Sequence, residues 1–529
     1  MEENTKAVKS AYNMRHSLVN YYLLIMFTFF EMFLTEQYAR ARTDKYILYV
    51  VLTTILFISI VVISISYKLD KNAPLEQRVV ENVPFFKLSI TDIAMIVFFL
   101  GAVICTIFSD YKLDSLTGNA GRNNGLILIA LYTAMYFILS RFYYFKNYIF
   151  VAFMVFGSLI SLLAILHFFY IDPLGLFSGY ADHVINNFGT TIGNKNTIAS
   201  YMCIFLPSAI MMFVLQKDKY VKILSAFSIG FAYCGLLVSG SNSGYIGFAL
   251  MLFFMALACV RKPHLLRNFM FAITIMFSSG LVLRLFSSIM NDKSKGFEKI
   301  GEKLIYSNLL FVIIASCGLV TLLLYLFKDK KFVNSNAFKN VLTIILSVIG
   351  IGVAGVVSYL FYYYSVVDTK TDIGSLSQLL RFNDAWGTHR GFMWIEGTKD
   401  FFKNDLYHLM FGSGCDTFYH VFEPHFEELN RRFSNTSTNS IHCEYLNYLV
   451  TQGIVGLLSY LTVVISALVR AFKTSKNNEL ILLFIFPIIA YCAQAVVNIY
   501  TPVVTPFLFI FIALCEALSR NSHPMNKLS

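Results

Sequence analysis

The hydrophobic residues of this chain come in long continuous runs rather than in a short repeating period. A run of about 20 apolar residues can cross a lipid bilayer as a helix. An outer-membrane barrel would instead alternate apolar and polar residues along each strand. The pattern predicts an all-α, polytopic helical membrane protein with about 14 transmembrane helices (12–14), at roughly 17–36, 46–67, 91–109, 125–141, 147–170, 197–216, 222–239, 244–260, 267–289, 305–327, 340–366, 443–469, 479–498 and 502–519.

The composition supports this class. Of the 529 residues, 57% are hydrophobic and only 14% are charged, and the mean hydropathy is +0.63. Because a soluble domain carries about 25% charged residues, the chain is not expected to be a soluble enzyme, a disordered chain or a coiled coil. The polar first ten residues, MEENTKAVKS, contain no small-residue cleavage site, so we expect no removable signal peptide.

The positions of the basic residues, which give the chain its net charge of +11, indicate how it is oriented in the membrane. If the N-terminus is cytoplasmic, 24 of the 42 Lys and Arg residues fall in inner segments and 18 fall outside. Seven of those 18 lie in one long loop, and without that loop the ratio is 24 to 11. Basic residues favour the cytoplasmic side of short loops, so both termini are predicted to be cytoplasmic. Short basic clusters between apolar runs also argue against nucleic-acid binding.

The long loop spans residues 367–441, just before the third-last predicted helix, and would be extracytoplasmic. Loops longer than about 15 residues are usually either functional or disordered. This loop contains both tryptophans of the chain, Trp386 and Trp394, with many Phe and Leu residues, so we expect a small folded cap of short amphipathic helices, the first around 390–402. The predicted organisation is helices 1–11 in residues 1–366, the cap in 367–441 and helices 12–14 in 442–529.

Common nucleotide and metal motifs are missing from the sequence. It contains no P-loop, no D-x-D pair and no H-E-x-x-H. The loop carries four histidines, but their spacing follows no metal-ligand pattern: His389, His408, His420 and His425. We therefore expect neither a metal nor a cofactor.

The residues most suggestive of chemistry lie in the loop and at the start of the twelfth predicted helix. Arg390 and Trp394 are four residues apart and would share a helix face. Gly412 and Gly414 permit a tight turn with positive φ. His442 is predicted in the first turn of a helix whose positively polarised end faces outward, which disfavours a protonated imidazole and attracts anions. A neutral histidine beside a phosphate-binding arginine is suited to general-base catalysis.

Five segments carry a family resemblance: RGFMW (390–394), GSGCDTF (412–418), HCEYL (442–446) followed by Gly453 and Gly456, and more weakly GNAGRNNG (118–125) and TTIGNKNTIASY (190–201). They resemble the R-G-x-x-W, G-x-G-x-D-T-F, H-N-E-Y-L…G-x-x-G, G-x-x-x-R-x-x-G and T-x-G-N-P-N-x-x-A-x-Y motifs of the O-antigen ligase/polymerase superfamily of bacterial membrane glycosyltransferases. The resemblance covers about residues 105–520.

The resemblance implies a GT-C-like fold and a reaction. Such enzymes transfer a glycan from polyprenyl diphosphate to an acceptor hydroxyl on the outer face of the cytoplasmic membrane, during assembly of a surface polysaccharide. The implied partners are the lipid-linked donor, a glycan or cell-envelope acceptor and the bilayer, and no metal is required. Polymerase and ligase activity differ only in the acceptor, and the sequence identifies neither the acceptor nor the sugar.

By this resemblance, His442 would take the proton from the acceptor hydroxyl and Arg390 would hold the diphosphate. The other residues implied in binding the diphosphate or glycan are Arg122, Arg381, Lys195, Glu444, Tyr445 and Trp394.

Two departures from the family pattern lead to hypotheses. The turn SGSNSG (239–244) has Asn242 where the family often has an arginine, and Lys195 stands where the family usually has proline. Lys195 is therefore hypothesised to replace the lost charge. Cysteine occupies two further motif positions, Cys415 and Cys443, which are hypothesised to form a disulfide that holds the G-S-G turn against His442.

A membrane transporter or lipid-linked oligosaccharide flippase is the alternative. Transporters often show two related halves, with charged or broken helices near the midplane of the membrane. Here the predicted spans are almost uncharged and one asymmetric loop dominates, which favours the enzyme.

Overall fold

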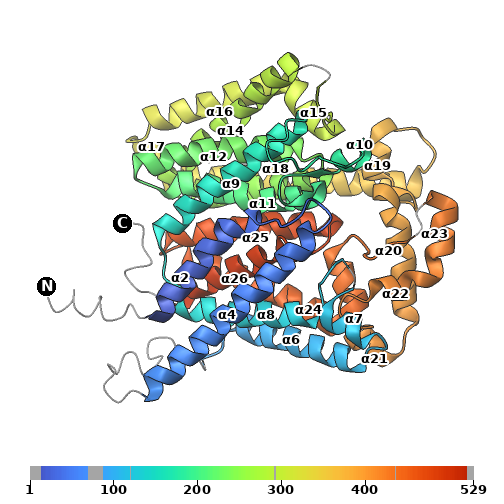
Figure 1. Cartoon of the computed structure of the whole chain (residues 1–529). Coiled ribbons are helices and arrows are strands. Elements are labelled where there is room, and N and C mark those ends of the chain that lie inside the picture. Colours follow the sequence, from blue (N-terminus) through green and yellow to red (C-terminus); the bar gives the residue numbers. More distant parts are fainter. Residues whose placement is uncertain (1–13, 70–86, 120, 291–292, 435–436, 521–529) are drawn as a thin grey trace.

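A computed structural model of the chain describes residues 14–69, 87–119, 121–290, 293–434 and 437–520 (Figure 1). These residues are mostly helical, and their only sheet is a two-stranded antiparallel pair, β1 (Phe188–Gly189) and β2 (Gly193–Asn194). The predicted all-α class is confirmed. The predicted cytoplasmic terminal segments, 1–13 and 521–529, lie outside the described residues.

Eleven helical segments in the described part of the chain are long and apolar enough to cross a membrane. The chain is therefore a polytopic membrane protein. The eleven segments are α4 (Ala41–Leu69), α6 (Ile90–Phe108), α9 (Asn147–Phe168), α11 (Lys195–Leu215), α12 (Lys219–Val238), α13 (Asn242–Val260), α14 (Pro263–Met290), α16 (Leu309–Leu326), α18 (Asn336–Tyr362) continued by η1 (Tyr363–Val367), α24 (Glu444–Thr474), and α25 (Leu482–Gln494) flanked by η4 (Glu479–Ile481) and η5 (Ala495–Val497).

The other three predicted spans form shorter helices. The first is broken at Thr28 into α2 (Met14–Phe27) and α3 (Phe29–Met32), the second is α8 (Leu126–Phe142) and the third is α26 (Thr505–Arg520). The α26 helix is nevertheless buried along almost its whole length, where it packs on α8, α24 and α25. Hydropathy located all fourteen helical regions, but among the described residues only eleven of them form helices of spanning length.

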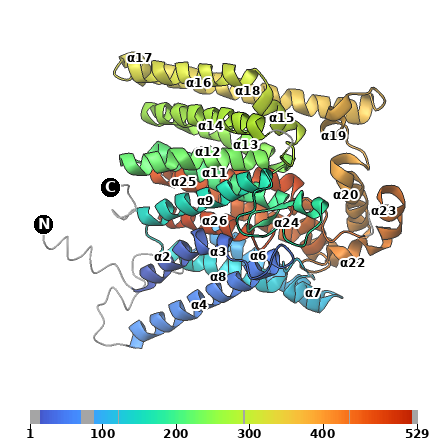
Figure 2. The ribbon, with the colours of Figure 1, turned by 45° about the horizontal axis from the view of Figure 1, so that its top comes forward.

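The cap lies at one end of the helical bundle, opposite the first and last described helical residues (Figures 1 and 2). The start of α2 and the end of α26 lie at one end, and the helices of the 374–433 segment lie at the other. The α16 and α18 helices run along the periphery, and α18 buries none of its residues, as expected for a helix that faces lipid.

Buried charges join the helices at the end away from the cap. Asp92, in the first turn of α6, lies 2.8 Å from the Arg141 guanidinium and also contacts Arg520. Arg520 in turn lies 2.8 Å from Glu516. An unpaired buried charge is costly, so separating these partners would be unfavourable. The network therefore links α6, α8 and α26 where their ends approach each other.

The cap consists of short helices around a small apolar core. That core includes Phe392, Phe401, Phe418 and Phe422. The predicted helix at 390–402 corresponds to most of α20 (Trp386–Lys403), but two shorter helices precede it. The remaining cap elements are η2 (Gly374–Leu376), α19 (Ser377–Leu380), α21 (Leu406–Phe411), α22 (Phe418–Phe422), η3 (Glu423–His425) and α23 (Phe426–Phe433).

Short helices connect several of the long ones. The connecting helices are α7 (Lys112–Thr117), α10 (Asp182–Ile185), α15 (Lys299–Tyr306) and α17 (Lys331–Asn334).

Candidate functional site

Asp416, in the G-S-G-C-D turn of the cap, connects this turn to the loop before α8 through hydrogen bonds. Its side chain is only 2% exposed, and one carboxylate oxygen accepts hydrogen bonds from the backbone N–H groups of Asn119 (3.0 Å) and Asn124 (3.1 Å). Burial raises the Asp416 pKa to about 6, although Arg122 and these two N–H groups oppose the shift. A buried carboxylate with these partners holds two distant segments in one arrangement.

Arg122 extends this contact to the segment that precedes α24. Its Nε atom lies 3.8 Å from the Asp416 carboxylate, and its Nη1 atom donates a hydrogen bond to the Asn439 side-chain oxygen at 3.0 Å. The Arg122 side chain is buried, which lowers its pKa, while the charge of Asp416 opposes that effect. The Arg122 guanidinium therefore lies where the 118–125 loop, the 412–418 turn and the 437–443 segment meet.

The two glycines of the turn are required by close packing. Gly412 and Gly414 both have positive φ, 74° and 126°, which confirms the predicted tight turn. A Cβ atom on Gly412 would lie 2.3 Å from the carbonyl carbon of Thr451 in α24, and one on Gly414 would lie 2.4 Å from the Ser109 hydroxyl oxygen. Only glycine allows this backbone conformation and this approach together.

His442 lies just outside α24, so its predicted position in the first helical turn is wrong. The helix begins at Glu444, and the extended N-cap residue Cys443 separates it from His442. His442 itself has a φ of 54°, an uncommon left-handed conformation for a residue with a side chain. Its Nδ1 atom is buried and has no hydrogen-bond partner in the described part of the protein.

The surroundings of His442 favour the neutral imidazole. Burial, followed by the charges of Arg390, Arg122 and Arg42, lowers the His442 pKa to about 3. This agrees with the predicted neutral state, but burial rather than the helix end is the main cause. Arg42, which sequence analysis did not single out, lies in the first turn of α4 and donates to the Gly121 carbonyl.

Arg390 and Trp394 both point toward the region around His442. Arg390 follows three residues of α20 with left-handed φ and ψ, and its Nη1 atom donates to the Val497 carbonyl at 2.7 Å. Among the described residues, no carboxylate lies within ion-pair distance of Arg390. Trp394, one turn later, donates from Nε1 to the Ile441 carbonyl at 2.8 Å. Burial lowers the Arg390 pKa.

A cavity of about 580 Å³ opens beside His442. It includes residues from the loop and helix before α8, from α22 and from the segment before α24. Its lining residues are Asp114, Asn119, Tyr419, His420, Ser437, Thr438, Asn439 and His442.

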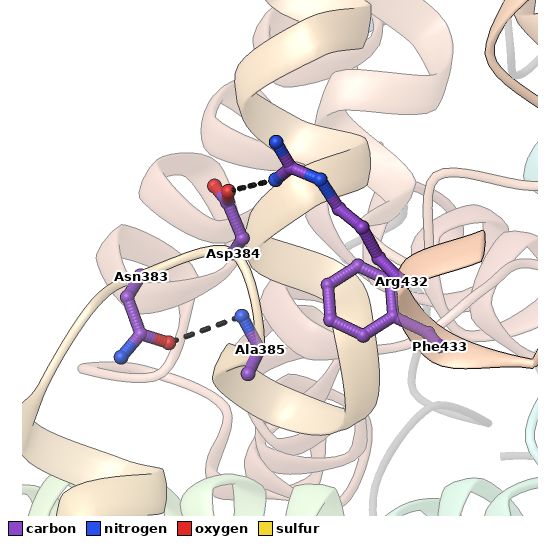
Figure 3. A pocket seen from close by; sticks show the side chains of 5 residues that line it. All are labelled: Asn383, Asp384, Ala385, Arg432 and Phe433. Carbon is purple, nitrogen blue, oxygen red and sulfur yellow. Dashed lines mark hydrogen bonds and ion pairs between the residues drawn. The ribbon is translucent and has the colours of Figure 1, made fainter. Parts of the chain in front are cut away.

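A second cavity, of about 530 Å³, lies on the cap (Figure 3). It is bordered by Asn383, Ala385 and Phe433, and Arg432 reaches across it to Asp384 at 2.5 Å. Both charged side chains of this pair are about two-fifths exposed, so the pair is a surface contact.

Arg381 and Lys195 do not line the cavity at His442. Arg381 donates to the backbone carbonyls of Tyr364 (3.3 Å) and Thr371 (2.5 Å), which fixes the chain after η1. The Lys195 ammonium lies 3.9 Å from the Glu298 carboxylate. Asn242, at the start of α13, is exposed.

Glu444 and Tyr445, at the start of α24, both contact α25, and Glu444 also contacts Tyr460 of its own helix. Glu444 is fully buried and accepts hydrogen bonds from the hydroxyls of Tyr460 (2.7 Å) and Tyr491 (3.0 Å). Tyr445 donates from its hydroxyl to the Cys492 carbonyl at 2.7 Å. Neither side chain lines the cavity beside His442.

The hypothesised disulfide between Cys415 and Cys443 is wrong. Both thiols are free, and the Cys415 sulfur lies 3.5 Å from that of Cys105 in α6. The backbone N–H of Cys415 donates to the Ser115 hydroxyl at 2.8 Å. The turn therefore packs against the end of α6, and the Cys415 thiol points toward that helix.

The four cap histidines make separate contacts. Among the described residues, no group of three or more His, Cys, Asp or Glu side chains could hold a metal ion. The contacts are His389 stacked on Phe433 with ring centroids 4.3 Å apart, His408 with Asp405 at 2.9 Å, His420 with Asp114 at 2.6 Å and His425 with Asp400 at 2.5 Å.

Comparison with protein-family models and with curated proteins finds no match for this chain. The functional interpretation therefore depends on the motifs and on the geometry of this site. Sequence reasoning selected Arg122, Arg390 and His442. Both arginines lie close enough to His442 for their charges to lower its pKa. It missed Arg42, Asn439 and the anchoring by Asp416, because nothing in their local sequence indicates which distant segment they contact.

Proposed function

We propose that the chain is a glycosyltransferase of the O-antigen ligase/polymerase type, with a GT-C-like membrane fold. It would transfer a glycan from polyprenyl diphosphate to an acceptor hydroxyl on the outer face of the cytoplasmic membrane, in surface polysaccharide biosynthesis. The observation that carries the proposal is that His442 lines a cavity, where burial, followed by the charges of Arg390, Arg122 and Arg42, lowers its pKa.

The charges around His442 suit a diphosphate. Arg42, Arg122 and Arg390 supply three positive charges, and Asp416 supplies one negative charge that contacts Arg122. The remaining excess of positive charge is partly buried, where a bound anion is held more strongly than in water. Arginine is also the side chain best shaped to hold phosphate oxygens in pairs.

The proposed reaction is a direct displacement at the anomeric carbon. His442 removes the proton from the acceptor hydroxyl while the acceptor oxygen bonds to that carbon. The bond from the carbon to the diphosphate oxygen breaks, and its electron pair leaves with the lipid diphosphate. The arginines stabilise this developing negative charge, so the leaving group needs no strong general acid.

The proposed orientation places the cap outside the cell and both termini in the cytoplasm. The basic residues of the short loops favour it. The cap and the two helix ends nearest the termini lie at opposite ends of the bundle, as this orientation requires (Figures 1 and 2). A cysteine-accessibility experiment with a membrane-impermeant maleimide on Ser434→Cys and on a cysteine appended to the C-terminus would test it.

Binding of a diphosphate should raise the pKa of His442. Burial and three arginines lower this pKa to about 3, and an anion close to the ring would raise it by about 1 to 3. NMR titration of histidine-labelled protein, with and without inorganic pyrophosphate, measures the change. The resonance of His425 serves as an internal reference. A His442 pKa that stays constant while pyrophosphate is bound would contradict the proposal.

Replacing Arg390 with lysine should weaken use of the donor. The variant keeps the charge but loses the planar group that can hold two phosphate oxygens at once. Because a hydrogen bond to a charged group contributes about 1.5–3 kcal/mol, kcat/KM for the donor should fall roughly 10- to 100-fold. Arg431→Lys, on the exposed face of α23, is the matched control and should retain wild-type values.

Reconstitution in liposomes with a fluorescent polyprenyl-diphosphate oligosaccharide tests the activity itself. A ladder of longer lipid-linked products identifies a polymerase, and transfer to a separate acceptor identifies a ligase. Movement of the unchanged lipid across the membrane would instead support the flippase alternative and contradict the proposal.

A further inference from the structure

The cavity beside His442 contains a histidine–carboxylate pair that the proposed reaction does not use. The Nε2 atom of His420, in α22, lies 2.6 Å from the Asp114 carboxylate in α7. The imidazole is also stacked on Tyr111, with ring centroids 4.0 Å apart and an interplanar angle of 5°. These two contacts fix the ring.

Charge is distributed unequally around His442. The residues of the described chain that line the cavity include one carboxylate, Asp114, and neither lysine nor arginine. The three arginines that lower the His442 pKa are not lining residues. Arg42 and Arg390 belong to α4 and α20, which do not border the cavity, and Arg122 lies in the same loop as the lining residue Asn119. A diphosphate would be attracted to the arginines and disfavoured beside Asp114.

The remaining lining groups suit a neutral ligand rich in hydroxyl groups. Hydroxyls and amides of Ser437, Thr438 and Asn439 can both donate and accept hydrogen bonds, and Tyr419 supplies an aromatic ring. A volume of about 580 Å³ is within the usual range of about 300–1,000 Å³ for small-ligand sites.

We propose that this cavity binds a sugar ring of the acceptor glycan, and that His420 and Asp114 hydrogen-bond to hydroxyl groups of that ring. This inference rests on the proposed function. In a displacement with inversion, the attacking oxygen and the leaving group occupy opposite faces of the anomeric carbon, and the base contacts only the attacking side. His442 lines the cavity, and the arginines do not.

The cap offers a matched control. His425 and Asp400 form a pair of the same kind, with Nε2 2.5 Å from the carboxylate. Their side chains are 18% and 27% exposed, compared with 21% and 38% for His420 and Asp114. The His425 pair does not line the cavity. If sugar binding were lost only because the cap loosened, replacement of His420 and replacement of His425 would therefore both cause the loss.

The first test is binding of neutral disaccharides of glucose, galactose and N-acetylglucosamine to the full chain in nanodiscs, observed by saturation-transfer NMR. His420→Phe keeps a ring that can stack on Tyr111 but removes both nitrogens. We expect at least one disaccharide to bind the wild type and His425→Phe, and its Kd to rise about tenfold or more in His420→Phe. Pyrophosphate should not displace it. Absence of binding, equal binding to both variants or displacement by pyrophosphate would overturn the inference.

The second test separates this inference from the proposed function. In the reconstituted transfer assay, His420→Phe should raise the KM for the acceptor about tenfold while the KM for the donor stays within about twofold. Transfer with an unchanged acceptor KM would overturn the acceptor site but leave the proposed function intact. Disaccharide binding that depends on His420, without any glycosyl transfer, would overturn the proposed function but support a sugar site.

Discussion

Replacement of His442 with alanine is expected to reduce glycosyl transfer by about 10²- to 10⁴-fold, the usual contribution of a general base. The variant lacks the group that would accept the hydroxyl proton, while the three arginines remain in place to bind the donor. The donor KM should therefore stay within about twofold of the wild-type value, and the loss should appear in kcat. Single-turnover assays with the fluorescent lipid-linked donor measure this step directly.

The matched control for this prediction is His425→Ala. His425 belongs to the cap and is partly buried against Asp400, but it contributes nothing to the cavity or to the charge at His442. Its replacement should leave kcat close to that of the wild type. Wild-type turnover by His442→Ala protein would refute the proposed role of the imidazole.

Removal of the Asp416 carboxylate is expected to destabilise the junction of cap and bundle and to abolish most activity. In Asp416→Ala, Arg122 remains buried without its counter-charge, and the N–H groups of Asn119 and Asn124 lose their acceptor. Breaking a buried ion pair costs about 3–5 kcal/mol. The change is measured by thermal unfolding of the detergent-solubilised protein, together with the transfer assay. Asp416→Asn keeps an acceptor oxygen and should lose less stability than the alanine variant.

The exposed pair between Asp384 and Arg432 provides the control (Figure 3). Exposed ion pairs contribute at most about 1 kcal/mol, so Asp384→Asn should unfold close to the wild-type temperature. Equal losses in the two aspartate variants, or a wild-type unfolding temperature for Asp416→Ala, would contradict the anchoring role of Asp416.

Hydropathy alone located most of the membrane helices, because a run of apolar side chains must avoid water wherever it occurs in the chain. It did not determine their lengths. The first predicted span is interrupted at Thr28. The last begins only at Thr505, with Pro502 before its start and Pro506 as its second residue. Helix ends depend on local backbone geometry and on neighbours, which an average over a window of residues does not contain.

The motifs indicated the neutral histidine and two of its arginines but placed some neighbours wrongly. His442 lies outside the helix that was predicted to contain it, and Cys415 contacts Cys105 instead of forming a disulfide with Cys443. The spacing of Cys415 and Cys443 along the chain gives no information about where the 412–418 turn packs. That packing is set by Gly412 and Gly414, which allow the turn to approach α24 and the end of α6.

The sequence by itself determined the class of protein, the location of the cap and the residue types at its junction with the bundle, since these follow from local hydrophobicity and short motifs. Tertiary structure alone decided that Arg42, Asp416 and Asn439 belong near Arg122 and His442, and that His420 and Asp114 line the same cavity as His442. These residues come from separate parts of the chain, at position 42, at 114–122 and at 416–442. Only the packing of the helices brings them together, and it is the resulting burial and summed charge that keep His442 neutral.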